Sequence, residues 1–188
     1  MYEFSKSWFD GSELKRKLLV YVDKSKQIDV LEIGCFEGAS ACFFSDNILD
    51  HESSTLDCVD PFFISGTVDG ITTRFIVDKT IDTFKSNISK SKNSGKITFH
   101  NETSDDFFEK NKKMYNLIYI DGCHEPDYIT RDLNNAFKVL EKGGIIWMDD
   151  YRGGSGDIIK NTIDSILQNY LGQFILIHMG YQLAIRKL

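Results

Sequence analysis

The sequence lacks any long apolar segment, and it does not begin with a charged stretch followed by an apolar one. A helix that crosses a membrane needs about 20 consecutive apolar residues, and a secretory signal needs a charged and then an apolar region. We therefore expect a cytoplasmic protein that neither spans a membrane nor is exported.

Basic residues are also fewer than acidic residues. The chain has 22 Lys and Arg against 28 Asp and Glu, which gives a net charge of −6 at pH 7. Binding to nucleic acid over a large surface needs a basic face that neutralises phosphates. The balance predicts that the protein has no nucleic-acid partner.

The cysteines are few and lack the spacing of metal ligands. Three of the four fall in segments that we predict to be buried, which is typical of free thiols in an intracellular protein. The residues are Cys35, Cys42, Cys58 and Cys123. The length of 188 residues, with 41% hydrophobic and 27% charged residues, indicates a single globular domain over residues 1–188.

The stretch VLEIGCFEG at residues 30–38, followed by ASACFF, predicts a buried strand, a tight turn and the start of a helix. In an open α/β sheet this is a place where a charged small molecule binds. Gly34 can adopt backbone angles that are closed to other residues, and Gly38 has no Cβ to obstruct a ligand or the next strand. Glu32 is a carboxylate inside an apolar strand, so it needs donors such as loop amides or a ligand ammonium group.

A second acidic residue, Asp60, ends the next predicted strand (residues 55–60) and precedes Pro61. An acid at the end of the second strand is placed to accept hydrogen bonds from ribose hydroxyls. The alternative is that Asp60 only forms a turn before proline.

The rest of the chain alternates between strand and helix patterns. We expect an edge-packed helix at 13–25 within an N-terminal extension (1–26), in which Trp8 and Phe9 could instead form a substrate lid. Residues 61–77 form a long connection of the kind that binds ligands or is disordered. Its Arg74 could meet an anionic substrate or face solvent. Ser104–Asp106 caps a short helix, and Gly143 and Gly144 end a later one. The predicted strands are 28–34, 55–60, 96–100, 115–121, 145–148, 174–178 and 181–186, the last two joined across Met179-Gly180, and the remaining helices are 38–49, 78–92, 127–141 and 157–170.

The segment LEIGCFEG resembles motif I of the class I S-adenosylmethionine-dependent methyltransferases. Phe36 stands where that family usually has glycine. A phenylalanine at this position is still less compatible with a dinucleotide-binding site, which needs glycine there so that the backbone can approach the pyrophosphate. The resemblance implies an α/β, Rossmann-like methyltransferase fold: a seven-stranded, mainly parallel sheet with an antiparallel C-terminal hairpin strand and helices on both faces. It also implies a cofactor site for S-adenosyl-L-methionine formed by Glu32, Gly34, Cys35, Phe36, Glu37, Gly38, Ser40, Asp60, Pro61, Phe62, Ser104, Asp105 and Asp121.

Three carboxylates follow two strands that are neighbours in this fold. Asp121 ends the strand at 115–121, and Asp149 and Asp150 follow the strand at 145–148. Neighbouring strands lie about 4.8 Å apart, so these acids should meet at one sheet edge and repel one another. A divalent cation would relieve that repulsion. Ligands that are all oxygen favour Mg²⁺, and Mn²⁺ and Ca²⁺ are the alternatives. The pattern resembles the metal-dependent O-methyltransferases of the catechol and sugar types.

The same resemblance suggests how the reaction would run. His124 lies three residues after Asp121, where the catechol enzymes have a lysine general base, so His124 and Asp121 are the expected catalytic residues. In the sugar enzymes the base is acidic and nearer position 123, which is Cys here. The chain is thus expected to methylate a small hydroxylated substrate such as a sugar, polyol or catechol, with Mg²⁺.

Two alternative interpretations remain open. One is a metal-independent methyltransferase that acts on nitrogen or oxygen. The other is a non-catalytic protein that only binds S-adenosylmethionine. The sequence also leaves open whether the chain forms a homodimer.

Overall fold

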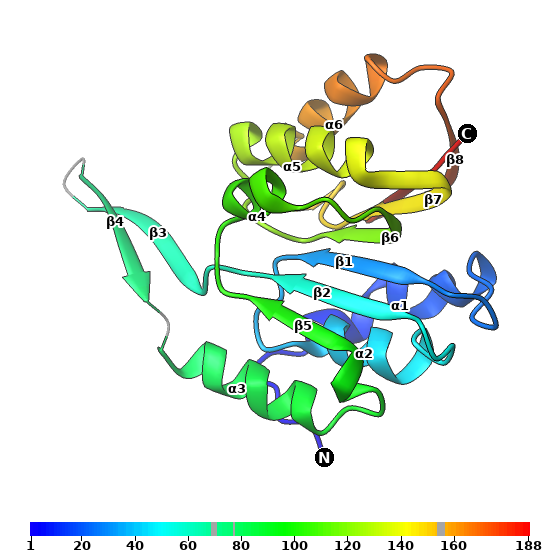
Figure 1. The fold of residues 1–188 in the computed structure, drawn as a ribbon. Helices are drawn as coiled ribbons and strands as arrows, with labels where there is room; N and C mark the ends of the chain where they lie inside the picture. The colour runs from blue at the N-terminus through cyan, green and yellow to red at the C-terminus, as the bar shows by residue number, and fades with distance from the viewer. Residues whose placement is uncertain (69–70, 77, 154–156) are drawn as a thin grey trace.

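Apolar segments of the sequence form a seven-stranded sheet at the centre of the protein (Figure 1). The structure is a computed structural model, which describes residues 1–68, 71–76, 78–153 and 157–188, with side chains outside 63–79. The strand order is β5 (Ile97–His100), β2 (Thr55–Val59), β1 (Asp29–Ile33), β6 (Tyr115–Ile120), β7 (Leu140–Met148), β9 (Leu183–Lys187) and β8 (Phe174–Met179). All pairings are parallel except those of β9 with β7 and β8. The predicted sheet, including its antiparallel C-terminal hairpin strand, is confirmed.

Helices cover both faces of this sheet, as predicted (Figure 1). On one face lie α4 (Ser104–Lys110), α5 (Pro126–Val139) and α6 (Ile158–Gln168). The other face is covered by α1 (Glu13–Lys17), α2 (Ala39–Asn47) and α3 (Asp78–Ser89). Successive residues of β1 supply the two cores: Val30 packs in one and Leu31 in the other. Strands buried on both sides form continuous apolar runs, which is why β1 and β6 were visible in the sequence.

The predicted helix at 13–25 is wrong in its length. The α-helix ends at Lys17 and continues only as a 3₁₀ turn, η2 (Leu18–Val20), after an earlier 3₁₀ turn, η1 (Trp8–Gly11). Leu18 is fully buried, whereas Val20 is 82% exposed. Tyr21 and Val22 still pack against the core, but Leu19 and Val20 are exposed, so the buried positions beyond Leu18 do not follow helical spacing.

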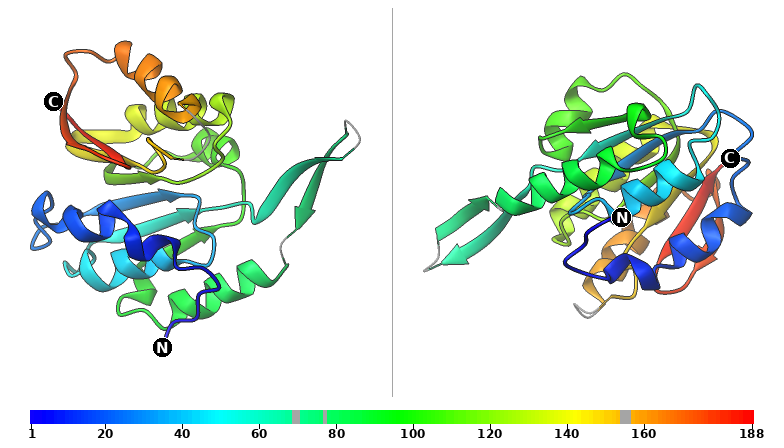
Figure 2. Two further views of the ribbon diagram at one scale, coloured as in Figure 1. Left: turned by 180° about the vertical axis from the view of Figure 1, so that it is seen from behind. Right: turned by 90° about the horizontal axis from the view of Figure 1, so that it is seen from below.

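The connection at 61–77 contains regular structure that we did not predict. Strands β3 (Phe63–Val68) and β4 (Ile71–Ile76) form an antiparallel hairpin that projects away from the main sheet (Figure 2). β-Branched residues make up half or more of each strand, which favours this pairing. The side chain of Arg74 lies outside the described residues, as does part of the loop at 152–156.

Three smaller boundaries also differ from prediction. Strand β7 begins at Leu140, so Gly143 and Gly144 lie in a strand with a register shift and do not end a helix. The cap of α4 is Thr103, whose hydroxyl accepts a hydrogen bond from the Asp106 amide at 3.2 Å. The C-terminal hairpin turns at residues 180–182, after β8 has run to Met179. Among the described helices, none is both long and apolar enough to cross a bilayer.

Candidate active site

The turn after β1 is held in an unusual backbone conformation. Gly34 and Gly38 both have φ of +83°, and Phe36 has φ of +45°. A Cβ added to Gly34 would overlap the backbone oxygen of Asp121 on the neighbouring strand end. The need for glycine at position 34 is therefore set by close approach of β6 as well as by its backbone angles.

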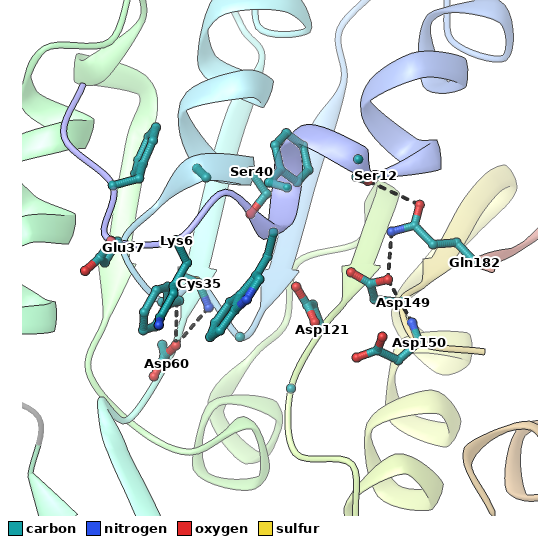
Figure 3. A pocket seen from close by; sticks show the side chains of 18 of the residues that line it. Lys6, Ser12, Cys35, Glu37, Ser40, Asp60, Asp121, Asp149, Asp150 and Gln182 are labelled. Carbon is teal, nitrogen blue, oxygen red and sulfur yellow. Dashed lines mark hydrogen bonds between the residues drawn. The ribbon is translucent and has the colours of Figure 1, made fainter. Parts of the chain in front are cut away.

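Asp60 fixes this turn by accepting backbone hydrogen bonds on both of its oxygens (Figure 3). Its Oδ2 accepts from the amides of Cys35 at 2.8 Å and Phe36 at 3.0 Å. Its Oδ1 accepts from the amide of Phe62 at 2.7 Å. Hydrogen bonds between backbone amides and a carboxylate are among the stronger ones in proteins, so the turn and Asp60 hold each other in one orientation.

Glu32 lies beneath the turn and is 0% exposed. Its carboxyl group accepts hydrogen bonds from the hydroxyl of Ser40 and from the thiol of Cys58, the latter at 3.3 Å. Burial raises the pKa of Glu32 to about 7. Hydroxyl and thiol groups from α2 and β2 thus meet the demand for donors that the sequence implied.

The three predicted acids do meet at one sheet edge, but they have different surroundings (Figure 3). Asp149 accepts from the Tyr119 hydroxyl at 2.6 Å, from Gln182 Nε2 at 2.8 Å and from the Asp150 amide at 2.7 Å. Burial, followed by the charges of Asp149 and Asp150, raises the pKa of Asp121 well above its usual range.

Asp150 is held from the other side of the acidic cluster, which comprises Asp121, Asp149 and Asp150. It accepts a hydrogen bond from the hydroxyl of Tyr181 and lies 3.1 Å from His124 Nε2. Its φ of +50° is in the left-handed region, which turns the chain sharply at the end of β7. His124 is brought to the cluster by the short turn that follows Asp121.

Gln182 is a site residue that our sequence analysis missed. Its Oε1 accepts from the amide of Leu14 at 2.6 Å and from Trp147 Nε1 at 2.9 Å, while its Nε2 donates to Asp149. The side chain therefore ties the start of α1 to the acidic cluster. Nothing in the local sequence marks this glutamine, because its partners come from two distant segments, the start of α1 and the end of β7.

One cavity of about 750 Å³ runs from the turn after β1 to the acidic cluster. The N-terminal segment (residues 2–14) passes over this cavity. Hydrogen bonds tie the segment to the protein on each side of the cavity. The Ser5 amide donates to Glu37 at 2.6 Å, and Leu14 is held by Gln182. The Trp8 ring lies 5.1 Å from that of Phe36. Eleven predicted site residues line the cavity: Gly34, Cys35, Phe36, Glu37, Ser40, Asp60, Phe62, Asp121, His124, Asp149 and Asp150.

The other predicted site residues lie outside the cavity lining. Glu32 is beneath the turn, and Gly38 packs against the ring of Phe84. Asp105 pairs with Arg131 at 2.9 Å, and Ser104 bonds to Asp132. Pro61 is half-buried beside Asp60. Their assignment to a cofactor site stays a prediction.

The sequence of residues 31–151 matches the model of a protein family described as a methyltransferase domain. The chain belongs to this methyltransferase family. The matched part holds the turn after β1, Asp60 and all three acids of the cluster. The protein is thus a class I S-adenosylmethionine-dependent methyltransferase, as the resemblance at motif I implied.

Solved structures share the methyltransferase's fold. The O-methyltransferase TomG of Streptomyces achromogenes, in complex with S-adenosylmethionine, superposes with a TM-score of 0.67 at 15% identity, covering 94% of this chain and 80% of TomG. An O-methyltransferase of Bacillus cereus, bound to S-adenosylhomocysteine, gives 0.66 at 16%, with 97% and 82% covered. An rRNA methylase of Streptococcus thermophilus gives 0.59 at 11%, with 93% of each chain covered. No curated protein matches the sequence.

Proposed function

We propose that this methyltransferase transfers a methyl group from S-adenosylmethionine to a hydroxyl oxygen of a small molecule, with the help of a divalent cation. One observation carries the proposal: a single cavity joins the turn after β1 to Asp121, Asp149 and Asp150. A methyl donor at the turn and a hydroxyl group at the acids would then face each other. Similarity in fold to two O-methyltransferases is consistent with this function.

The turn after β1 supplies the donor end of the proposed site. Gly34 lets the chain pass close to β6, and Asp60 holds the loop amides in one orientation. Asp60 also lines the cavity, where its carboxylate is within reach of a nucleoside's hydroxyl groups. The acidic lining around it favours a sulfonium cation.

The cluster supplies the acceptor end. Its carboxylate oxygens are the ligands that Mg²⁺ and related cations prefer, and mutual repulsion of the acids favours a bound cation. A divalent cation bound there would orient a substrate hydroxyl and stabilise the oxyanion that forms when the proton leaves. Asp121, Asp149 and Asp150 are the predicted ligands, and His124, the predicted base, lies beside Asp150.

The N-terminal segment would limit the access of water to the reacting groups. Trp8 and Phe9 line the cavity, which is the arrangement that a substrate lid requires. Excluding water favours catalysis by alignment and electrostatics, which we expect to carry most of the rate gain. The acidic charge of the chain favours a small substrate over a nucleic acid.

The test is a screen of sugars, polyols and catechols for production of S-adenosylhomocysteine, with Mg²⁺ or with EDTA. We expect turnover with at least one hydroxylated compound, and a loss of about 100-fold or more in the Asp121→Asn variant. Turnover that is unchanged by EDTA would support the metal-independent alternative. Calorimetric binding of the donor without turnover on any compound would support a non-catalytic binding protein.

A further inference from the structure

Three side chains at the acidic end of the cavity lie close enough to share one cation: Asp121, His124 and Asp150. One ligand atom from each lies within 4.8 Å of the other two. His124 Nε2 is 3.1 Å from Asp150 Oδ2, so this nitrogen already faces the carboxylates. The trio follows the ends of β6 and β7, and all three residues line the cavity that also contains Asp60.

Asp149 differs from the other two acids because protein donors occupy both of its oxygens. By contrast, among the described residues Tyr181 donates only to Oδ1 of Asp150, and Tyr119 donates only to Oδ2 of Asp121, at 3.2 Å. Oδ2 accepts from Tyr119, and Oδ1 accepts from Gln182 and from the backbone amide of Asp150. Gln182 is itself fixed by Trp147 and Leu14, and it is 1% exposed. Turning Asp149 toward a cation would leave buried donors unpaired, which costs about 1–3 kcal/mol for each group.

We propose that His124 binds the cation together with Asp121 and Asp150, while Asp149 positions the cluster from behind. This inference rests on the cation-assisted function proposed above and replaces two of its predicted roles. His124 becomes a ligand instead of the general base, and Asp149 becomes a support instead of a ligand. The same Nε2 lone pair cannot hold a cation and accept a proton, so the two roles of His124 exclude each other.

An imidazole ligand changes which cation the site prefers. Mg²⁺ favours sites made only of oxygen, whereas imidazole nitrogen suits first-row transition metals such as Mn²⁺ and Co²⁺. A site with two carboxylates and one imidazole should therefore bind Mn²⁺ more tightly than Mg²⁺. The hydrogen bonds from Tyr119 and Gln182 to Asp149 would keep the strand ends in place around it.

The test uses Mn²⁺ alone as a probe of the full chain, so it needs no substrate. Electron spin echo modulation of bound Mn²⁺ detects a directly bound imidazole through its ¹⁴N nucleus. We expect this modulation in the unmodified protein, and we expect it to change when histidine is labelled with ¹⁵N. Labelling alters no contact, so this arm does not depend on whether a variant folds.

Variants then assign the signal to a residue. His124→Gln should abolish the modulation, whereas Asp149→Asn should retain it and lower the Mn²⁺ affinity by about tenfold, an effect typical of losing a residue that supports the ligands. His51→Gln is the matched control, because His51 precedes β2 at the end of the sheet opposite the acidic cluster, and it should change neither quantity.

Three other outcomes would overturn the inference. Bound Mn²⁺ without any ¹⁴N modulation would mean that His124 is not a ligand, while the cation-assisted function would stand. An Asp149→Asn variant that loses as much affinity as Asp121→Asn would make Asp149 a ligand. If Mn²⁺ does not bind at millimolar concentration, both this inference and the proposed cation-assisted function are wrong. Calorimetry with S-adenosylhomocysteine would then show separately whether the donor site survives.

Discussion

The two ends of the cavity satisfy their carboxylates in different ways. At the turn after β1, Asp60 is satisfied by backbone amides from two neighbouring strand ends. At the acidic cluster, Asp149 relies on the side chains of Tyr119 and Gln182, which lie 30 and 33 residues away in the sequence. The backbone donors Cys35 and Phe36 are themselves 25 and 24 residues from Asp60. The two ends therefore differ in the kind of donor, which is backbone at the first and mainly side chain at the second.

This difference predicts how each end responds to mutation. Backbone donors cannot be removed by a side-chain substitution, so the turn should fail only when its path is changed. Side-chain donors can be removed one at a time, so the acidic cluster should lose its order in steps. Four substitutions test this contrast, in order of decreasing expected effect.

Gly34→Ala should damage the turn and cause the largest loss of stability. The new Cβ would overlap the Asp121 backbone and would also be strained at a φ of +83°. We expect a loss of about 3 kcal/mol or more in the free energy of unfolding, measured by urea titration. Gly95→Ala is the control, because a Cβ there meets no atom within 4 Å. Equal stability of the two variants would contradict the close approach of the turn and β6.

Gln182→Leu should destabilise the acidic cluster. It removes the acceptor of the Leu14 amide and of Trp147 Nε1, and both groups are buried. We expect a loss of about 2–4 kcal/mol in the free energy of unfolding. Gln168→Leu, on the exposed end of α6, should change it by less than about 0.5 kcal/mol. A small effect of Gln182→Leu would show that other groups accept the hydrogen bonds of the Leu14 amide and of Trp147 Nε1 when Gln182 is absent.

Glu32→Gln should change how stability depends on pH. The folded pKa of about 7 lies above the usual value of 4.5, so between these values the unfolded chain loses its proton first. Wild-type stability due to Glu32 is therefore present below pH 4.5 and is lost as the pH rises through 7. The variant cannot titrate, so its stability relative to wild type should rise by up to about 3 kcal/mol over this interval. Urea titrations across this range and one pH unit above it measure the difference, and a constant difference would refute the raised pKa.

Trp8→Ala should have the smallest effect on the fold. The Trp8 side chain is 70% exposed, and its ring packs against that of Phe36. We expect a change below about 1 kcal/mol in stability, but a loss of several-fold in S-adenosylhomocysteine affinity if the N-terminal segment covers the ligand. Calorimetry on the variant and on wild type provides the measurement. Unchanged affinity would assign Trp8 to surface packing, which is the alternative interpretation of this segment.

The contrast also explains what could be predicted from the sequence. The turn was visible because Gly34 interrupts a buried apolar run, and Asp60 was visible as an acid at a strand end. Asp121, Asp149 and Asp150 were found because their strands are apolar enough to locate. Gln182 and Tyr181 were missed because a residue in a hairpin turn acquires its partners only when the chain has folded.

The predicted boundaries of some elements were wrong for a related reason. The hairpin of β3 and β4 is held by pairing between its own strands, and short apolar runs separated by polar residues do not predict such pairing. Likewise Thr103, one residue before the predicted cap, takes the position because its hydroxyl reaches the Asp106 amide. Several adjacent polar residues are of types that commonly cap helices, so residue type alone does not identify the cap of α4.

The position of Cys123 has a practical consequence. All four cysteines lie among the described residues, and three of them are buried, whereas Cys123 is exposed on the turn between Asp121 and His124. Maleimide chemistry on the native chain would thus attach a fluorophore or spin label selectively at the rim of the acidic cluster, with no engineering. Such a reporter would register cation or ligand arrival directly, by changes in emission or in spin-label mobility.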